Sequence, residues 1–126
     1  IPVVATFFVF SDYMKPAIRL SAIQELPVKF VWTHDAFRVG EDGPTHQPVE
    51  QEAQIRLLEK LKNHSGNSSF VALRPADSAE TVVGWKMLLE NNKVPSGLIL
   101  SRQGIKDIPH HLIGQWIRSS NLTRSF

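Results

Sequence analysis

The sequence predicts an α/β domain with three layers, in which helices cover both faces of a mainly parallel sheet. Short apolar runs rich in β-branched and aromatic residues alternate with segments of helical spacing. This alternation implies right-handed crossovers between parallel strands. At 126 residues the chain has the length of one domain, and we expect folding to bury about two-thirds of its unfolded surface.

The first half of the chain contributes two strands and two helices. Residues 3–9 are apolar throughout, which predicts a strand covered on both faces. Residues 11–25 predict a helix, because Ser or Asp can cap its start and a Leu-Pro pair follows its end. Residues 28–33 predict a second buried strand. A helix over residues 49–61 is expected next, with an apolar face made of Ala53, Ile55, Leu57, Leu58 and Leu61.

The second half repeats the pattern. Residues 70–73 predict a third strand, stopped by an Arg-Pro pair. Asp77 stands three residues before Glu80, which is the spacing of a capping box, so a helix is expected from there to about Asn91. Residues 97–101 predict a fourth strand. The third helix is expected to bury Val82, Trp85, Met87, Leu88 and Leu89.

Polar residues gather where the predicted strands end. In parallel α/β sheets, ligands bind outside the carboxyl ends of the strands. Here those ends are residues 8–13, 33–46, 74–77 and 101–103. The segment 34–48 is the richest of them, since it holds two histidines, three carboxylates, two glycines and a Gly-Pro turn. We therefore expect the functional site at this edge.

Composition excludes several classes of protein. The chain is 42% hydrophobic and 21% charged, as in ordinary globular domains, and contains no cysteine for a disulfide framework or a thiolate metal site. The net charge is +2 and the basic residues are scattered, so we expect no nucleic-acid partner. No targeting segment or bilayer-spanning stretch is evident, and a cytoplasmic location is expected. The chain opens without methionine inside a strand, which indicates a piece of a longer polypeptide.

Two sets of candidate residues each allow a structural and a functional interpretation. Phe7, Phe8, Phe10 and Tyr13 are typical of core packing, or of a slot for a flat heteroaromatic ring. Arg102 follows the fourth strand, where it can grip a phosphate or be an ordinary surface arginine.

The histidine loop allows three interpretations. His34 and His46 stand among Asp35, Glu41 and Asp42, and imidazole and carboxylate are both common metal ligands. Their spacing matches no metal motif, however. Histidines in such a loop more often hydrogen-bond a substrate or move protons, since imidazole exchanges protons near neutral pH. Solvated side chains are the remaining interpretation.

Four blocks of sequence carry a specific likeness. They are THD at 33–35, GEDGPTHQP at 40–48, LRPAD at 73–77 and LSRQ at 100–103. In this order they closely resemble the pyrimidine-binding domain of transketolase, and the likeness covers residues 1–109. The 1-deoxyxylulose-5-phosphate synthases share a DGPTH core and are the related alternative, but the QPVE continuation at 47–50 resembles transketolase.

The resemblance implies a function and a set of roles. Transketolases use thiamine diphosphate and a divalent cation, magnesium or calcium, to move a two-carbon ketol unit from a ketose phosphate to an aldose phosphate in the pentose phosphate pathway. The cofactor carries the nucleophilic chemistry while the protein orients the reactants. By position, the aminopyrimidine is held by Phe7, Phe10 and Tyr13. The substrate phosphate is bound by His34 and Arg102, a sugar hydroxyl by Asp42, and the donor near the cofactor by the catalytic His46.

The resemblance also implies what lies elsewhere. In the family, the glutamate that protonates the pyrimidine ring precedes this segment, and the metal ligands and diphosphate motif belong to another domain. The site is shared between the subunits of a homodimer, so the isolated fragment is expected to be inactive. Residues 110–126 do not match the expected continuation and predict a divergent tail with a short amphipathic helix. Outside this family, a metal hydrolase using His34, Asp42 and His46 and a non-catalytic pairing module stay open.

Overall fold

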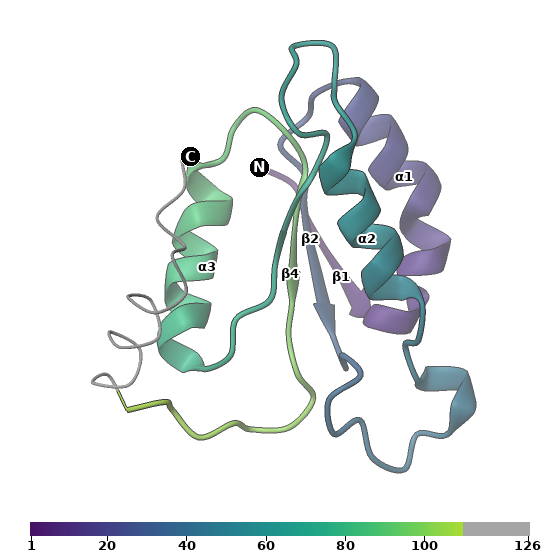
Figure 1. The fold of residues 1–126 in the computed structure, drawn as a ribbon, viewed down its shortest axis with the longest axis vertical. Helices are drawn as coiled ribbons and strands as arrows, with labels where there is room; N and C mark the ends of the chain where they lie inside the picture. The colour runs from purple at the N-terminus through teal and green to yellow at the C-terminus, as the bar shows by residue number, and fades with distance from the viewer. Residues whose placement is uncertain (110–126) are drawn as a thin grey trace.

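The computed structural model describes residues 1–109, and strands and helices alternate along them as predicted (Figure 1). The elements in chain order are strand β1 (Val3–Phe7), the 3-10 helix η1 (Phe8–Phe10), helix α1 (Ser11–Ile23), strand β2 (Lys29–Thr33), the 3-10 helix η2 (Pro44–His46), helix α2 (Gln51–Lys60), strand β3 (Val71–Leu73), helix α3 (Ser78–Glu90) and strand β4 (Ser96–Ile99). The tail predicted at 110–126 lies outside the described residues.

The four strands form one parallel sheet in the order β1-β2-β4-β3. Helices α1 and α2 lie on one side of this sheet and α3 lies on the other, which gives three layers (Figure 1). The predicted α/β class with a parallel sheet is confirmed. Within residues 1–109, no helix is both long and apolar enough to cross a membrane.

The core is built around aromatic side chains of β2. Trp32 is fully buried, and its ring lies against Phe8, Phe30 and Phe70 at centroid distances of 5.7, 5.8 and 6.2 Å. A Cβ at Gly97, on the neighbouring strand β4, would lie 2.3 Å from the Trp32 ring. Only glycine therefore lets the indole ring cross β4. Burying aromatic side chains of this size stabilises the fold by about 1.5–3 kcal/mol each.

Helix α3 begins as predicted. The Asp77 carboxylate accepts a hydrogen bond from the Glu80 backbone N–H at 2.8 Å, which satisfies one of the unpaired donors of the first turn. The Glu80 carboxylate accepts from the Ala76 N–H at 2.7 Å. The capping interaction is confirmed, with the return bond displaced by one residue.

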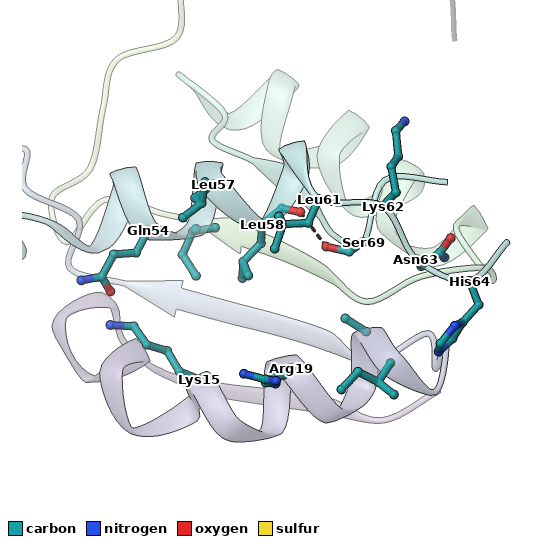
Figure 2. Close-up of a pocket in the computed structure, with 13 residues that line it drawn as sticks. Lys15, Arg19, Gln54, Leu57, Leu58, Leu61, Lys62, Asn63, His64 and Ser69 are labelled. Atoms are coloured by element: carbon teal, nitrogen blue, oxygen red, sulfur yellow. Dashed lines mark hydrogen bonds between the residues drawn. The ribbon is translucent and has the colours of Figure 1, made fainter. Parts of the chain in front are cut away.

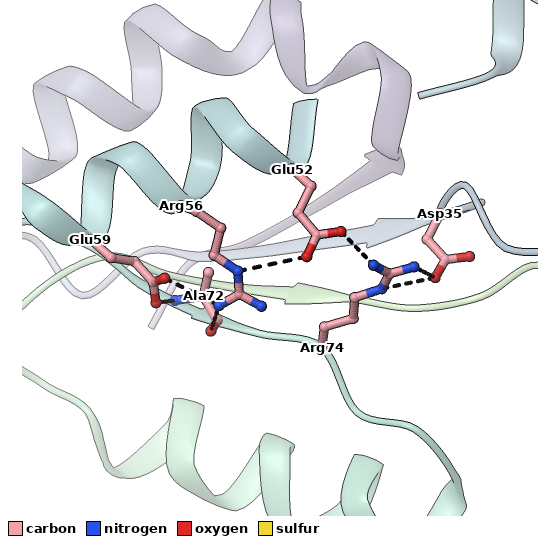
Figure 3. A network of polar contacts seen from close by, with 6 residues as sticks. All are labelled: Asp35, Glu52, Arg56, Glu59, Ala72 and Arg74. Carbon is pink, nitrogen blue, oxygen red and sulfur yellow. Dashed lines mark hydrogen bonds and ion pairs between the residues drawn. The ribbon is translucent and has the colours of Figure 1, made fainter. Parts of the chain in front are cut away.

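The edge strand β3 has its outer side occupied by side chains of α2 (Figure 3). Glu59 accepts a hydrogen bond from the Ala72 N–H at 2.8 Å, and Arg56 donates to the Ala72 carbonyl at 3.0 Å. Unpaired backbone groups on an edge strand are a template for further pairing. At Ala72 both backbone groups are satisfied within the domain.

Strand β1 is shorter and more exposed than predicted. It ends at Phe7, and Phe8 turns into η1. The expectation of a strand covered on both faces was wrong, since Val3 is 51% and Val4 39% exposed. The physical reason is position: β1 is an edge strand with a single neighbour, and α3 lies on the β4 side of the opposite face (Figure 1).

The apolar faces expected for two helices were also partly wrong. Helix α2 buries Ile55 and half-buries Leu58, while Leu57 and Leu61 are 60% and 50% exposed. Helix α3 buries only Leu88 of its predicted face, and the other four members are exposed or half-buried. Helical spacing identifies apolar residues without telling which of them meets the sheet. The exposed residues of that face are Val82 and Leu89, and the half-buried ones are Trp85 and Met87.

Candidate functional site

The carboxyl ends of β2 and β4 are joined by backbone hydrogen bonds. The Leu100 N–H donates to the Trp32 carbonyl at 2.7 Å, and the Asp35 N–H donates to the Leu100 carbonyl at 3.2 Å. These bonds bring the segment after β2 beside the segment after β4. His34 and Arg102 therefore belong to one edge of the sheet, as the sequence predicted.

Five rings meet at the carboxyl end of β1. The Phe7 ring stacks on the His34 imidazole, with centroids 3.8 Å apart and planes 22° from parallel. Phe10 lies 6.0 Å from Phe7 in a nearly parallel orientation, and the His46 imidazole meets Phe10 edge-on at 5.4 Å. Tyr13 extends the cluster 6.1 Å from Phe10 and is 83% exposed. Ring surface is therefore open to a flat ligand, which gains from stacking and desolvation.

His34 occupies a special backbone conformation. Its φ is +59°, in the left-handed region that non-glycine residues rarely adopt. The Thr33 hydroxyl lies 3.0 Å from His34 Nδ1. This turn directs the imidazole onto Phe7 instead of along the strand. The ring expected at the substrate phosphate is thus in direct contact with a ring expected at the pyrimidine.

Arg102 and Asp42 form a second group across the loop. Arg102 Nη1 lies 3.3 Å from Asp42 Oδ2 and also donates a short hydrogen bond to the Val39 carbonyl. The Asp42 contact has the distance of an ion pair without hydrogen-bond alignment, so the buried Oδ2 atom keeps unused acceptor capacity. Gly40, at φ +86°, leaves room for Arg102, since a Cβ there would lie 2.9 Å from Nη1.

The loop returns to the aromatic cluster through a tight turn. Gly43 has φ +80°, and Pro44 starts the 3-10 turn that ends at His46. The His46 N–H donates to the Gly43 carbonyl at 3.1 Å, and the Thr45 hydroxyl lies 2.8 Å from His46 Nδ1. The GEDGPTH sequence therefore sets Asp42 toward Arg102 and His46 toward Phe10.

A network of charged side chains, formed by Asp35, Arg74 and Glu52, lies at the start of the loop that follows β2 (Figure 3). The Asp35 carboxylate is buried and accepts two hydrogen bonds from Arg74, at 3.1 and 2.8 Å, and one from the Phe37 N–H at 3.0 Å. Arg74 also pairs with Glu52 of α2 at very short range. Asp35 is the residue after His34, so this network fixes the backbone that carries the imidazole.

A smaller contact joins the starts of α1 and α2. Asp12 pairs with Lys15 at 2.6 Å and accepts a hydrogen bond from Gln51 at 3.0 Å. The bond from Lys15 is the main reason that the pKa of Asp12 falls below its usual value, and Gln51 adds to the effect. The start of α1 borders the aromatic cluster, because Asp12 immediately precedes Tyr13.

The predicted site residues are thus brought together in two groups, with His34, His46, Phe7, Phe10 and Tyr13 in one and Asp42 with Arg102 in the other. Their individual roles stay predictions. Arg74 was not among the predicted site residues, although it pairs with the buried Asp35 beside them. Its position at the carboxyl end of a strand, shared with Asp35, was the available signal.

The metal interpretation gains no support in the described part. Among residues 1–109, no three His, Cys, Asp or Glu side chains gather closely enough to hold a metal ion. Each of the two predicted histidines instead meets an aromatic ring, and Asp42 meets a guanidinium group. The aromatic cluster fits an organic ligand with a flat ring, and the Asp42 Oδ2 atom, which lacks an aligned donor, fits a hydroxyl group.

The fold and these contacts define an α/β domain with a parallel sheet whose candidate site lies at the carboxyl ends of the strands. Residues 1–107 match the family described as transketolase, pyrimidine binding domain. The chain belongs to this family.

Related proteins agree with this assignment. A transketolase of Halalkalibacterium halodurans is 52% identical over 101 residues, covering 80% of this chain and 14% of the relative. A transketolase of Staphylococcus aureus is 44% identical over 124 residues, covering 97% of this chain and 17% of the relative. The chain therefore spans 14–17% of the length of these relatives.

Solved structures agree as well. Transketolase from Campylobacter jejuni matches with a TM-score of 0.72 and 43% identity, over 86% of this chain and 16% of that chain. A transketolase from Pichia stipitis in complex with sedoheptulose-7-phosphate matches with a TM-score of 0.71 and 38% identity, over 84% of this chain and 14% of that chain. The described arrangement of strands and helices is thus that of a known transketolase domain.

Proposed function

We propose that this chain supplies the pyrimidine-binding half of a transketolase site. The enzyme transfers a two-carbon ketol unit from a ketose phosphate to an aldose phosphate, with thiamine diphosphate and a divalent cation held mainly by other parts of a cytoplasmic homodimer. The chain on its own is inactive in this proposal, since it spans 14–17% of the length of its relatives.

One observation carries the proposal more than any other. The Asp42 Oδ2 atom is buried and lacks an aligned donor, on the same loop that sets His46 against Phe10. A buried acceptor without a donor is costly unless a ligand completes it. A sugar hydroxyl is such a donor, and a nearby ring cluster fits the pyrimidine.

In this proposal the aromatic cluster binds the cofactor and His46 acts on the donor substrate. When bound, thiamine diphosphate supplies the nucleophilic carbon that carries the ketol unit. The open ring surface of Phe10 and Tyr13 binds the pyrimidine by stacking. The His46 imidazole, held at 2.8 Å by Thr45, is placed to hold or move the proton of a donor hydroxyl.

The polar group completes substrate binding. Arg102 donates to the substrate phosphate in a charge-assisted contact, and the Asp42 carboxylate accepts from a sugar hydroxyl. Arg102 Nη1 and Asp42 Oδ2 lie 3.3 Å apart in the structure. Substrate binding replaces this ion pair with two hydrogen bonds, one from Arg102 to the phosphate and one from a sugar hydroxyl to Asp42.

A chimera tests this proposal. Residues 1–107 of this chain replace the matching segment of the Halalkalibacterium halodurans transketolase, and ketol transfer is measured with thiamine diphosphate and magnesium. We expect activity within about tenfold of the parent, because 52% of the aligned positions are identical and the site residues are present. A folded, dimeric chimera without activity would contradict the proposal.

A further inference from the structure

A groove separates α1 from α2 outside the aromatic and polar groups of the strand-end site (Figure 2). Its volume is about 700 Å³, and the two helices and the segment 61–69 line it. Pockets for small organic ligands have volumes of roughly 300–1,000 Å³ and are lined mainly by apolar side chains with a few polar groups. The groove has the size and composition of such a pocket.

The apolar part of the groove comes mainly from residues that were predicted as the buried face of the second helix. Ile55 and Leu58 form its inner part, while Leu57 and Leu61 are 60% and 50% exposed along its border. Ile23 faces them from α1 and is 47% exposed. Exposed apolar side chains that gather around a hollow mark a binding surface more often than isolated ones do.

The charge of the groove has one sign. Its charged or ionisable lining residues are Lys15, Arg19, Lys62 and His64, and no Asp or Glu lines it. Asp12 already neutralises Lys15 at 2.6 Å. In contrast, Arg19 and Lys62 have no ion pair within the described part of the chain. A ligand that matches this lining carries negative charge.

Two buried amide atoms in the lining lack hydrogen-bond partners. They are Gln54 Oε1 and Asn63 Nδ2, which lie toward opposite ends of the groove (Figure 2). Asn63 uses its other side-chain atom, Oδ1, to accept from the Asn67 N–H at 2.9 Å. Its free N–H₂ group is therefore a donor held in place without an acceptor. Leaving such a buried donor unpaired is unfavourable, so a ligand that accepts a hydrogen bond from it gains affinity.

We propose that this groove binds a small organic anion with an extended apolar body, of the class of medium-chain carboxylates. The head group accepts hydrogen bonds from the Arg19 guanidinium and the Asn63 amide, and the apolar body lies over Leu58 and Leu61. None of these contacts involves the strand-end site, so this site stands whether or not the proposed ketol transfer is correct.

Titration of the 126-residue chain with decanoate, below the concentration at which it forms micelles, tests the proposal by calorimetry. We expect one saturable site. Decyltrimethylammonium, with the same chain and opposite charge, and acetate, with the charge and no chain, are each expected to bind at least about tenfold more weakly. Equal binding of the cationic amphiphile, or no saturable binding of decanoate, would overturn the proposal.

Variants locate the site. Arg19→Glu and Leu61→Gln change exposed side chains of the groove and are each expected to weaken decanoate binding by about tenfold. Lys93→Glu makes the same charge change at an exposed lysine outside the groove and is expected to leave binding unchanged. Loss of binding in all three variants would indicate general charge attraction and contradict the assignment.

Backbone amide shifts of the wild-type chain give a location that does not depend on variants. With decanoate, NMR shifts are expected in α1, α2 and residues 61–69, and shifts confined to the strand ends would refute the proposal. An acidic amphipathic peptide that binds the groove more tightly than decanoate would also overturn it, since the occupant would then be a protein helix.

Discussion

Replacement of Arg74 by alanine is expected to destabilise the domain more than any other change of an exposed charge. Its partner Asp35 has a side chain only 6% exposed, and two of its three hydrogen bonds come from Arg74. Arg74→Ala removes both and leaves a buried carboxylate without its cation. Asp35 would keep only the bond from the Phe37 N–H.

The magnitude follows from burial. Removing one partner of a fully buried ion pair costs about 3–5 kcal/mol, and exposed pairs contribute about 0–1 kcal/mol. The Arg74 side chain is 33% exposed, so solvent screens part of the interaction. We therefore expect about 2 kcal/mol. For 126 residues this corresponds to a fall in Tm of roughly 7 °C.

Urea unfolding of the 126-residue chain measures the effect, with Glu52→Gln as the matched control. Glu52 is the other partner of Arg74, but its side chain is 36% exposed, so its loss is expected to cost less than about 1 kcal/mol. If Arg74→Ala and Glu52→Gln lower the unfolding free energy equally, the idea that Asp35 needs Arg74 is refuted.

Two further stability predictions follow from the core. Burial lowers the pKa of Lys29 in the folded chain below its usual 10.5. Between the folded pKa and 10.5 the unfolded chain binds more protons, so the free energy of unfolding rises with pH toward 10.5. Lys29→Met should lose this rise in urea titrations at several pH values, and an unchanged pH dependence would contradict the assignment. Gly97→Ala places a methyl group 2.3 Å from the Trp32 ring and should cost about 1–3 kcal/mol or more, whereas Gly104→Ala, with nothing within 4 Å, should cost little; equal thermal shifts would argue against the close packing.

Local sequence rules predicted the order of elements because they act over a few residues. Asp77 and Glu80 marked the start of α3, and the polar segment after β2 marked the edge of the sheet where the candidate site residues gather. These signals depend on neighbouring residues alone. They needed no knowledge of which strands lie side by side.

Burial could not be predicted in the same way, because it depends on the strand order. The chain order of strands is β1, β2, β3, β4, but the sheet order is β1-β2-β4-β3. Strand β1 lies at one end of the sheet with β2 as its single neighbour, so Val3 and Val4 are exposed despite their apolar character. The same limit applies to Leu57 and Leu61, whose helical spacing is correct and whose face is turned toward the groove.

The sequence predicted which residues gather at this edge of the sheet but not the contacts between them. The positive φ of His34 turns its imidazole onto Phe7, and no pattern in the sequence predicts that backbone conformation. The pairing of Arg74 with Asp35 joins residues 39 positions apart and arises because the ends of parallel strands meet at one edge.

The proposed catalytic role of His46 offers the most direct test of the central claim. His46→Ala is introduced into the chimera with the Halalkalibacterium halodurans transketolase, and kcat and KM for ketol transfer are compared with those of the unmodified chimera. A side chain that moves a proton in the reaction contributes about 10²–10⁴-fold, so a loss of that size in kcat is predicted, with folding preserved by circular dichroism. Unchanged turnover would contradict the assignment of this loop to the transketolase site.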